Sequence, residues 1–319
     1  MNGTYDEADE TYEVIVIGGG AAGLSAALVL GRARRRTLVI DAGEPRNAPA
    51  AHMHGYLSRD GMAPADFLAA GREEIARYGV ELVRDRAVDV VRDTDFAVVL
   101  AGGRTVRARQ LVVATGLKDE LPPLPGLAER FGRDVLHCPY CHGWEVRDRA
   151  FGVLATTPLS VHQALMVTQW SKDVTLFLHT VTEEDLSDDD LRRLAAAGVR
   201  VIPGEVSGLT TENDRLTGIR LTDGTEYPRE VLFVAPRPVP RTDLPARLGA
   251  EMTDTPFGAY PVVDPLGRTT VPGLWAAGNA SGFAEQVINA ASRGYRAGAA
   301  INGELLMTDL DATLATTDD

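Results

Sequence analysis

The feature that most constrains the fold is residues 12–43, YEVIVIGGGAAGLSAALVLGRARRRTLVIDAG. The continuous apolar run at 14–17 predicts a buried strand, the Ala- and Leu-rich run after the glycines predicts a helix, and residues 37–40 predict a second strand. A strand, a helix and a strand in that order form a βαβ unit, which is the building block of a parallel sheet covered by helices.

The glycines at the turn of this unit indicate a bound dinucleotide. Gly18, Gly20 and Gly23 have the spacing G-x-G-x-x-G. The first allows the tight turn, the second lets a pyrophosphate approach the backbone, and the third lets the helix pack on the strand. Helix N–H groups then meet the phosphates, and Asp41, at the end of the second strand, is placed to accept hydrogen bonds from a ribose. Since strand, turn, helix and acid coincide, we expect a dinucleotide site.

The composition narrows the class of partner. The chain has 319 residues, of which 45% are hydrophobic and 24% charged, as in a globular protein of about two domains. Its net charge of −13 would repel nucleic acid and anionic lipid. It contains no apolar run of about 18 residues, and its first residues are acidic, unlike a signal peptide. We therefore expect a cytoplasmic protein that binds neither nucleic acid nor membranes.

The only two cysteines, Cys138 and Cys141, lie in VLHCPYCHGWE at residues 135–145. In a reducing compartment a C-x-x-C pair is more often catalytic or metal-binding than structural. At the start of a helix, for which Pro139 is suited, the sulfurs come within bridging distance and the helix dipole lowers the thiolate pKa. His142 follows directly, and an imidazole titrates near neutral pH, as thiol exchange requires.

Two other interpretations of this stretch are weaker. The cysteines and their neighbours His137 and His142 could bind zinc, but structural zinc sites usually draw ligands from two separated segments, and the sequence has no second Cys/His knuckle. The cysteines could also be inert buried thiols. We favour a redox pair and expect no metal.

Two later segments resemble flavin-binding sequences. Residues 108–126 contain a strand, an A-T-G turn and a Pro-rich connector, and residues 271–301 contain a strand, a Gly-Asn turn and a long helix of small residues. They resemble the second and third flavin-binding segments of the two-dinucleotide-domain flavoproteins. The resemblance implies FAD as the cofactor, with Asn279 in place of the usual aspartate. It also implies that Gln286 lies where a helix N-terminus faces the flavin pyrimidine ring, which stabilises negative charge there.

The order of these segments resembles low-molecular-weight thioredoxin reductase over nearly the whole chain. The resemblance implies an α/β fold with two Rossmann-like, three-layer ββα dinucleotide-binding domains. Residues 11–117 and 245–319 would form the FAD-binding domain. Residues 118–244 would form an inserted domain, similar to an NADPH domain, that carries the C-x-x-C. The Pro-rich stretches at 122–126 and 234–245 would connect the two.

Two motifs indicate a closer resemblance. C-P-Y-C-H-G-W-E and A-P-A-A-H-M-H-G-Y-L-S-R-D-G, residues 48–61, are similar to sequences of the gliotoxin- and holomycin-type dithiol oxidases of the same superfamily. The resemblance implies that His142, where thioredoxin reductases have aspartate, deprotonates the substrate thiol. It makes Cys141 the sulfur nearer the flavin and Cys138 the exchanging sulfur. It also implies a homodimer and a small dithiol substrate of the kind found in antibiotic biosynthesis.

The candidate flavin contacts come from the glycine turn, the segment after the second strand and the two later segments. The three from the loop after residue 43 could equally be plain surface residues. The candidates are Gly18, Gly20, Ala21, Ala22, Gly23, Asp41, Ala42, Arg46, Asn47, His54, Ala114, Thr115, Gly116, Gly278, Asn279, Gln286 and Val287.

The second domain departs from the thioredoxin reductase pattern, in which a Gly-rich turn and a later basic triplet hold NADPH. Here the turn is A-T-T-P at 155–158, so both early glycines are missing and β-carbons would crowd a pyrophosphate. After the next strand, L-H-T at 178–180 offers no arginine for a 2′-phosphate. NADPH binding is therefore doubtful, although a divergent loop could still bind it.

The loss of a hydride donor would reverse the direction of electron flow. Electrons would enter from a dithiol through Cys138 and Cys141 and leave the flavin to O₂, giving H₂O₂. This predicts an FAD-dependent dithiol oxidase that forms an internal disulfide in its substrate. One alternative is a thioredoxin-reductase-like disulfide reductase that uses NADPH or ferredoxin. Another is a flavin-binding redox sensor without turnover, which would not need His142.

Overall fold

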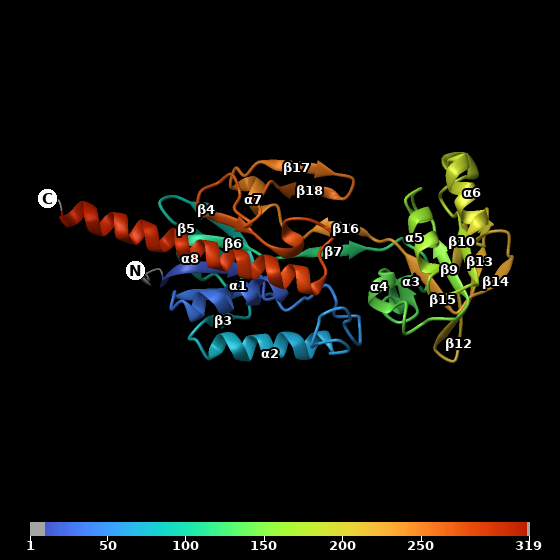
Figure 1. Cartoon of the computed structure of the whole chain (residues 1–319), viewed down its shortest axis with the longest axis horizontal. Helices are drawn as coiled ribbons and strands as arrows, with labels where there is room; N and C mark the ends of the chain where they lie inside the picture. Colours follow the sequence, from blue (N-terminus) through green and yellow to red (C-terminus); the bar gives the residue numbers. More distant parts are fainter. Residues whose placement is uncertain (1–9, 318–319) are drawn as a thin grey trace, which may run out of the picture. The chain divides into compact units, whose positions relative to one another are not determined.

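The computed structural model describes residues 10–317, which divide into two compact units. Unit 1 comprises the described residues up to 48, residues 65–118 and those from 238 onward, and unit 2 comprises residues 49–64 and 119–237. Figure 1 colours the chain by residue number, from blue at the N-terminus to red at the C-terminus. The units differ from the expected ranges at their boundaries. Residues 49–64 group with the cysteine segment, and Lys118 and residues 238–244 group with the glycine turn.

A seven-stranded sheet forms the centre of unit 1, in the order β3-β2-β1-β6-β5-β4 with β19 paired to β6. The strands are β1 (Glu10–Ile17), β2 (Thr37–Ile40), β3 (Glu81–Val83), β4 (Ala87–Arg92), β5 (Phe96–Leu100), β6 (Thr105–Val113) and β19 (Leu274–Ala276). Strands β1, β2, β3, β6 and β19 pair in parallel, whereas β4 and β5 are antiparallel. Every residue of β2 is buried, as expected for a central parallel strand covered on both faces. The predicted βαβ unit is confirmed.

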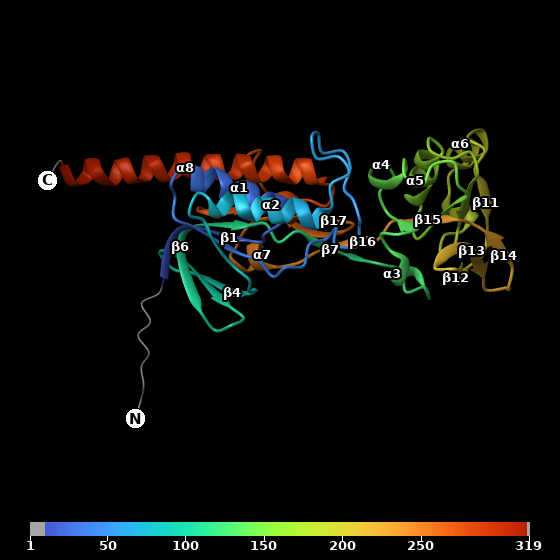
Figure 2. The ribbon, with the colours of Figure 1, turned by 90° about the horizontal axis from the view of Figure 1, so that it is seen from below.

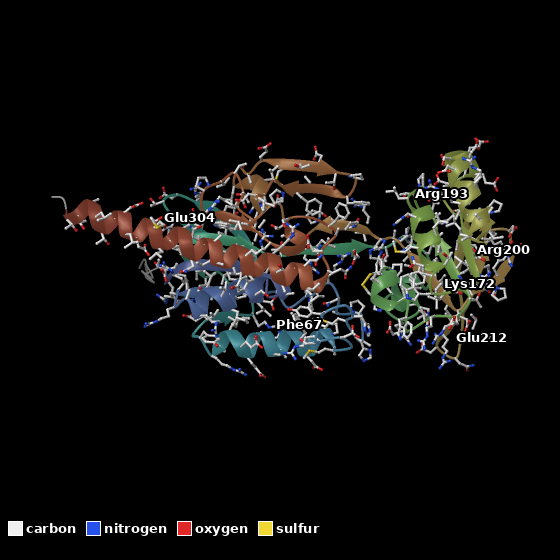
Figure 3. The ribbon with its side chains drawn as sticks, in the orientation of Figure 1. Phe67, Lys172, Arg193, Arg200, Glu212 and Glu304 are labelled. Carbon is white, nitrogen blue, oxygen red and sulfur yellow. A yellow bond between two sulfur atoms is a disulfide. The ribbon has the colours of Figure 1, made fainter. Side chains whose placement is uncertain are left out.

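Helices cover one face of this sheet. They are α1 (Ala21–Arg32), α2 (Pro64–Ala76) and α8 (Val287–Thr317). Helices α1 and α8 lie side by side in Figures 1 and 2, and their backbones nearly touch. A Cβ on Gly294 would lie 1.9 Å from the Ala22 carbonyl oxygen, and one on Gly298 would lie 2.7 Å from that of Ala26. Phe67 of α2 packs against the apolar core that lies between these helices and the sheet (Figure 3).

The opposite face of the unit 1 sheet carries a second core cluster. Val90 of β4 and Leu244 of α7 (Leu244–Arg247) pack there with Ile15 and Leu38. The remaining elements of the unit are β17 (Met252–Thr255), β18 (Gly258–Pro261) and the single turn η2 (Gly278–Ala280). Apolar side chains therefore cover the central strands on both faces.

Unit 2 has a parallel five-stranded sheet in the order β11-β10-β9-β15-β8. The strands are β8 (Val135–Leu136), β9 (Phe151–Leu154), β10 (Val174–Phe177), β11 (Arg200–Ile202) and β15 (Val231–Val234). Its core has two halves. Val153 packs in one half with α5 (Ser160–Val167) and α6 (Asp188–Ala196). Phe177 packs in the other with Val206 and Ile219.

The second half of that core belongs to a three-stranded antiparallel sheet, β12 (Val206–Glu212), β13 (Arg215–Leu221) and β14 (Glu226–Pro228). Unit 2 is thus a three-layer ββα arrangement, and the predicted α/β, Rossmann-like fold class is confirmed. The short helices α3 (Leu127–Arg130) and α4 (Pro139–His142) and the turn η1 (Glu183–Asp185) complete it.

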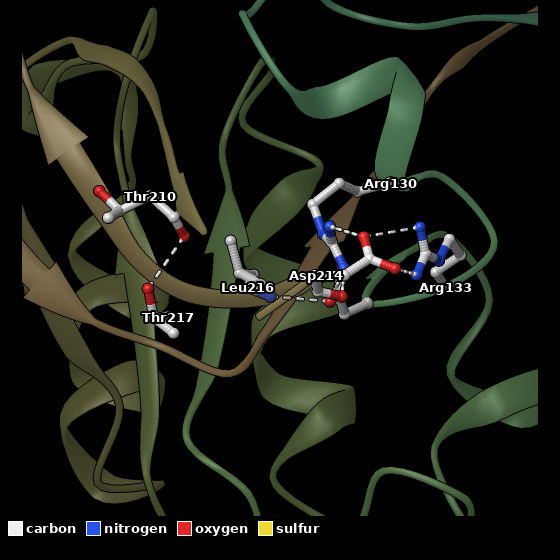
Figure 4. A network of polar contacts seen from close by, with 7 residues as sticks. Arg130, Arg133, Thr210, Asp214, Leu216 and Thr217 are labelled. Atoms are coloured by element: carbon white, nitrogen blue, oxygen red, sulfur yellow. Dashed lines mark hydrogen bonds and ion pairs between the residues drawn. The ribbon is translucent and has the colours of Figure 1, made fainter. Parts of the chain in front are cut away.

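Arg130 attaches α3 to the β12–β13 hairpin (Figure 4). Its guanidinium donates to both carboxylate oxygens of Asp134, at 2.5 and 2.6 Å, and to the carbonyl of Asp214 at 2.8 Å. Asp134 also accepts from the N–H of Leu216 at 2.9 Å. Arg133 pairs with the same Asp214 from the solvent side. The Arg130 side chain is only 7% exposed, so this network is part of the packing of unit 2.

Two short strands carry the chain between the units. They are β7 (Leu117–Glu120) and β16 (Arg237–Pro240), which pair with each other as a separate two-stranded sheet. Arg237 also forms an ion pair with Glu120. Between residues 10 and 317, no helix has the length and apolar character needed to cross a bilayer.

Candidate functional site

The glycine turn of unit 1 leaves room for a ligand at one of its three motif positions. Gly18 has φ +113°, and a Cβ there would lie 2.3 Å from the carbonyl oxygen of Ala114. A Cβ on Gly23 would lie 1.8 Å from the carbonyl oxygen of Gly18. No atom lies within 4 Å of a Cβ built on Gly20. The first and third glycines are therefore needed by the fold, and the second faces open space.

The N-terminus of α1 supplies hydrogen-bond donors beside that space. The first helical hydrogen bond runs from the N–H of Leu24 to the carbonyl of Gly20, at 2.9 Å. The N–H groups of Ala21, Ala22 and Gly23 precede it, and a helix leaves such groups without an internal acceptor. These N–H groups are therefore positioned to donate hydrogen bonds to an anion.

Asp41 lies directly beside this turn. Its carboxylate accepts from the N–H groups of Gly19 and Gly43, each at 3.2 Å, and from Arg84 at 2.9 Å. A carboxylate has about four acceptor positions, so one remains for a ribose hydroxyl. Ala42 follows and is exposed.

The two later segments reach the same edge of the sheet. Residues 114–116 follow β6 and residues 278–279 follow β19, and both strands run parallel to β1. The Oγ1 of Thr115 is buried and has no hydrogen-bond partner among the described residues. The Nδ2 of Asn279 donates to the carbonyl of Gly282 at 3.0 Å. Ligands of such sheets bind at the carboxyl ends of the strands, which is where these groups gather.

The remaining flavin candidates take different positions. Gln286 immediately precedes α8, whose first residue is Val287. Arg46 and Asn47 lie, partly buried, in the loop after β2. His54 lies in unit 2. The open face of Gly20, the α1 donors, Asp41 and the orphaned Thr115 hydroxyl fit the pyrophosphate and ribose of FAD. The individual contacts remain predictions.

In unit 2, the C-x-x-C begins the short helix α4, as predicted. Cys138 is the N-cap and Pro139 is the first helical residue. The cysteines form a disulfide with Cα atoms 5.2 Å apart. The N–H of Cys141 donates to the Sγ of Cys138 at 3.2 Å. A Cβ on Gly143, just after the helix, would lie 2.6 Å from the Pro139 carbonyl oxygen, so only glycine fits this close turn.

His142 is the last residue of α4 and is partly buried. Burial lowers the pKa of His142, Glu145 raises it, and His54 and His137 lower it. Its ring has no hydrogen-bond partner among residues 10–317. The imidazole is therefore neutral near pH 7 and able to accept a proton. The Nδ1 of His137 instead donates to the carbonyl of Val234 at 3.2 Å, which indicates a structural role for that ring.

Sequence reasoning missed one feature of this region. The Nδ1 of His54 lies 3.3 Å from Asp60, and its Nε2 lies 3.5 Å from Glu145. The short spacing between His54 and Asp60 within a Gly-containing loop could have suggested that pair. No local pattern connects either residue to Glu145.

The described residues contain no group of three or more His, Cys, Asp or Glu that could hold a metal ion.

Residues 12–294 match the pyridine nucleotide-disulphide oxidoreductase family, and the chain belongs to this family. Members of the family and the related thioredoxin reductases are FAD-binding flavoproteins. The protein is accordingly an FAD-dependent thiol–disulfide oxidoreductase.

Individual relatives agree with this class. Thioredoxin reductase sirT of Leptosphaeria maculans is 34% identical over 323 residues, covering 94% of this chain and 96% of its own. Thioredoxin reductase tcpT of Claviceps purpurea (strain 20.1) is 33% identical, covering 92% and 94%. The crystal structure of HlmI superposes with a TM-score of 0.92 at 46% identity, covering 99% of both chains. The resemblance to thioredoxin-reductase-like flavoproteins is confirmed.

Proposed function

We propose that the protein is an FAD-dependent dithiol oxidase. It converts a small natural-product dithiol to its internal disulfide through Cys138 and Cys141, with O₂ as the electron acceptor: R(SH)₂ + O₂ → R(S–S) + H₂O₂. Two electrons and two protons leave the substrate and are recovered in the peroxide. The reaction therefore balances without a nicotinamide nucleotide.

The observation that carries this proposal is the start of α5, where a second nucleotide would be expected. The N–H groups of Ser160, Val161 and His162 donate to the carbonyls of residues 157, 158 and 159, at 3.0, 3.1 and 3.2 Å. The donors that a pyrophosphate needs are thus already used by the carbonyls of residues 157–159. In unit 1 the corresponding donors at α1 have no such acceptors among residues 10–317. This contrast supports one working dinucleotide site.

His179 gives a second reason to doubt NADPH. It follows β10, where thioredoxin reductases carry their basic triplet. Its Nδ1 accepts from the N–H of Val206 at 3.1 Å, and burial lowers its pKa. A neutral, hydrogen-bonded histidine offers no charge to a 2′-phosphate.

The cysteine pair is arranged for two successive exchanges. In the first, a substrate thiolate attacks the Cys138 sulfur, and Cys141 leaves as a thiolate. In the second, the other substrate thiolate attacks the first substrate sulfur, and Cys138 leaves. The Cys141 N–H at 3.2 Å stabilises negative charge on that leaving sulfur. FAD, when bound, would supply the two-electron acceptor for the reduced cysteine pair, with O₂ as the final acceptor.

His142 is the base that generates the substrate thiolate in this scheme. Its lowered pKa keeps it unprotonated near pH 7, and it follows Cys141 directly in the chain. A positioned base of this kind typically contributes about 10²- to 10⁴-fold in rate.

Exposed aromatic side chains beside the pair suit a small cyclic substrate. Tyr140, between the two cysteines, is 70% exposed, and Trp144 is 65% exposed. Tyr140 is held edge-on against Trp170 with ring centroids 5.8 Å apart. Such rings supply apolar contact at little entropic cost. By resemblance, we propose that a homodimer is the working form.

The test is anaerobic reduction of the FAD-loaded protein, followed by the flavin absorbance band. We expect reduced dithiothreitol to bleach the band and NADPH to leave it unchanged. On admission of air, the flavin colour should return and one equivalent of H₂O₂ should form. Rapid bleaching by NADPH would instead establish the alternative, an NADPH-dependent disulfide reductase. If neither reagent bleaches the band but reduced ferredoxin does, the ferredoxin-dependent alternative holds.

A further inference from the structure

The loop at residues 49–64 is built as part of unit 2. A Cβ on Gly132 would lie 2.7 Å from the carbonyl oxygen of Pro49, so the loop starts in close backbone contact with the segment before β8. Met53 is buried, and its backbone exchanges hydrogen bonds at 2.9 Å with Gly61 and Met62. The loop is therefore closed on itself and anchored.

Within this loop, His54 is held on both sides. Its Nδ1 lies 3.3 Å from Oδ2 of Asp60, whose other oxygen accepts from the N–H of Gly55 at 2.9 Å. Its Nε2 lies 3.5 Å from Oε1 of Glu145. The histidine side chain is 19% exposed, while those of Asp60 and Glu145 are 66% and 40% exposed. A mostly enclosed imidazole is therefore in contact with two carboxylates that are exposed to solvent.

Glu145 joins this arrangement to the cysteine helix. Its N–H donates to the carbonyl of His142 at 3.2 Å, so the two residues occupy one turn of backbone. Glu145, His54 and His137 are the charged and titratable groups that act on the His142 ring. Of these groups, His54 and Glu145 contact each other, and we take them as the partners for proton exchange with His142.

The proposed reaction needs such an exchange. Each turnover removes two protons from the substrate, but one imidazole holds only one additional proton. His142 must therefore release the first proton before it can take the second. The lowered pKa of His142 favours release of the proton. Titratable groups that lead from His142 to solvent would make this release fast.

We propose that His54, held between Asp60 and Glu145, is a positioning residue through which the proton taken up by His142 passes to solvent. The inference rests on the proposed oxidase function. In the step concerned, a substrate S–H bond breaks, the proton goes to His142, and the electron pair stays on sulfur. That sulfur then forms the bond to Cys138 as the Cys138–Cys141 bond breaks and Cys141 leaves as a thiolate. The relay carries protons only, and the electrons follow the cysteine pair.

The experiment compares His54→Asn and Glu145→Gln with the matched control His52→Asn. His52 is an exposed histidine two residues away in the same loop. The rate of anaerobic flavin bleaching by excess reduced dithiothreitol is measured at pH 7. We expect both relay variants to be slowed about tenfold, less than the loss of a directly acting base, and His52→Asn to match the wild type. Free imidazole should partly restore the rate of His54→Ala.

The pH profile separates a relay from a merely structural role. Glu145 raises the pKa of His142, and a protonated His54 lowers it. Glu145→Gln should therefore shift the acid limb of the bleaching rate to lower pH, and His54→Asn should shift it to higher pH. A structural defect would not move the limb in opposite directions.

The possible failures are distinguishable. If dithiothreitol does not bleach the wild type, the oxidase function fails and the relay fails with it. If the wild type is bleached but both variants match its rate and acid limb, the relay alone is wrong. If His54→Asn fails to fold, Glu145→Gln decides, because its side chain is on the surface and its loss should leave the fold intact.

Discussion

At the scale of single residues, Gly23 and Gly20 have different roles in the glycine turn. Gly23 allows the turn to pack closely, whereas Gly20 leaves space for the ligand. A methyl group at Gly23 would meet the Gly18 carbonyl oxygen at 1.8 Å. We expect Gly23→Ala to lower the free energy of unfolding of the apoprotein by about 1–3 kcal/mol, because the turn must shift. Denaturant titration of the apoprotein measures this.

Gly20→Ala is the matched variant. Its methyl group enters space with no atom within 4 Å, and Gly20 has φ −82°, which alanine adopts freely. The apoprotein should keep its stability to within about 0.5 kcal/mol. Its affinity for FAD should nevertheless fall, since the methyl group blocks the approach of the pyrophosphate. Fluorescence titration with FAD would contradict the assignment if Gly20→Ala bound as tightly as the wild type.

At the scale of elements, the contact between α3 and the β12–β13 hairpin depends on one buried cation. Arg130→Ala would leave Asp134 largely enclosed without its bidentate partner. We expect it to lower the free energy of unfolding by about 3 kcal/mol. Arg133→Ala removes an ion pair to the same Asp214, but the side chains of Arg133 and Asp214 are 49% and 70% exposed. It should cost at most about 1 kcal/mol. Equal losses in thermal or denaturant unfolding would contradict this account.

The elements also show what sequence patterns can and cannot foresee. The strands at 37–40 and 174–177 and the start of α4 at Pro139 were predictable, because apolar runs, Pro and turn residues act locally. The antiparallel pair β4–β5 was not predicted. The link between His54 and Glu145 was also missed, because it joins residues far apart in the chain. Only the folded backbone brings them together.

At the scale of the whole molecule, FAD should stabilise the two units unequally, since every flavin candidate except His54 lies in unit 1. At a free FAD concentration 100 times the dissociation constant, the gain is about 2.7 kcal/mol. Hydrogen exchange should show added protection in β1, β2 and α1, and little change in β9 and β15. Adding NADPH should leave α5 unaffected. Protection by FAD concentrated in unit 2 would overturn the assignment of the site.

The pairing of β7 with β16 makes the molecule modular. The chain leaves unit 1 and returns to it along neighbouring strands, so a short turn in place of residues 121–236 would rejoin them without moving either, and a short loop costs little entropy to close. The same flavin core could therefore carry a different insert. The exception is the loop at 49–64, which belongs with unit 2 although it is encoded far upstream. An exchange that left this loop behind would transfer the cysteine helix without His54, which contacts Glu145, so the loop and the insert must be exchanged together.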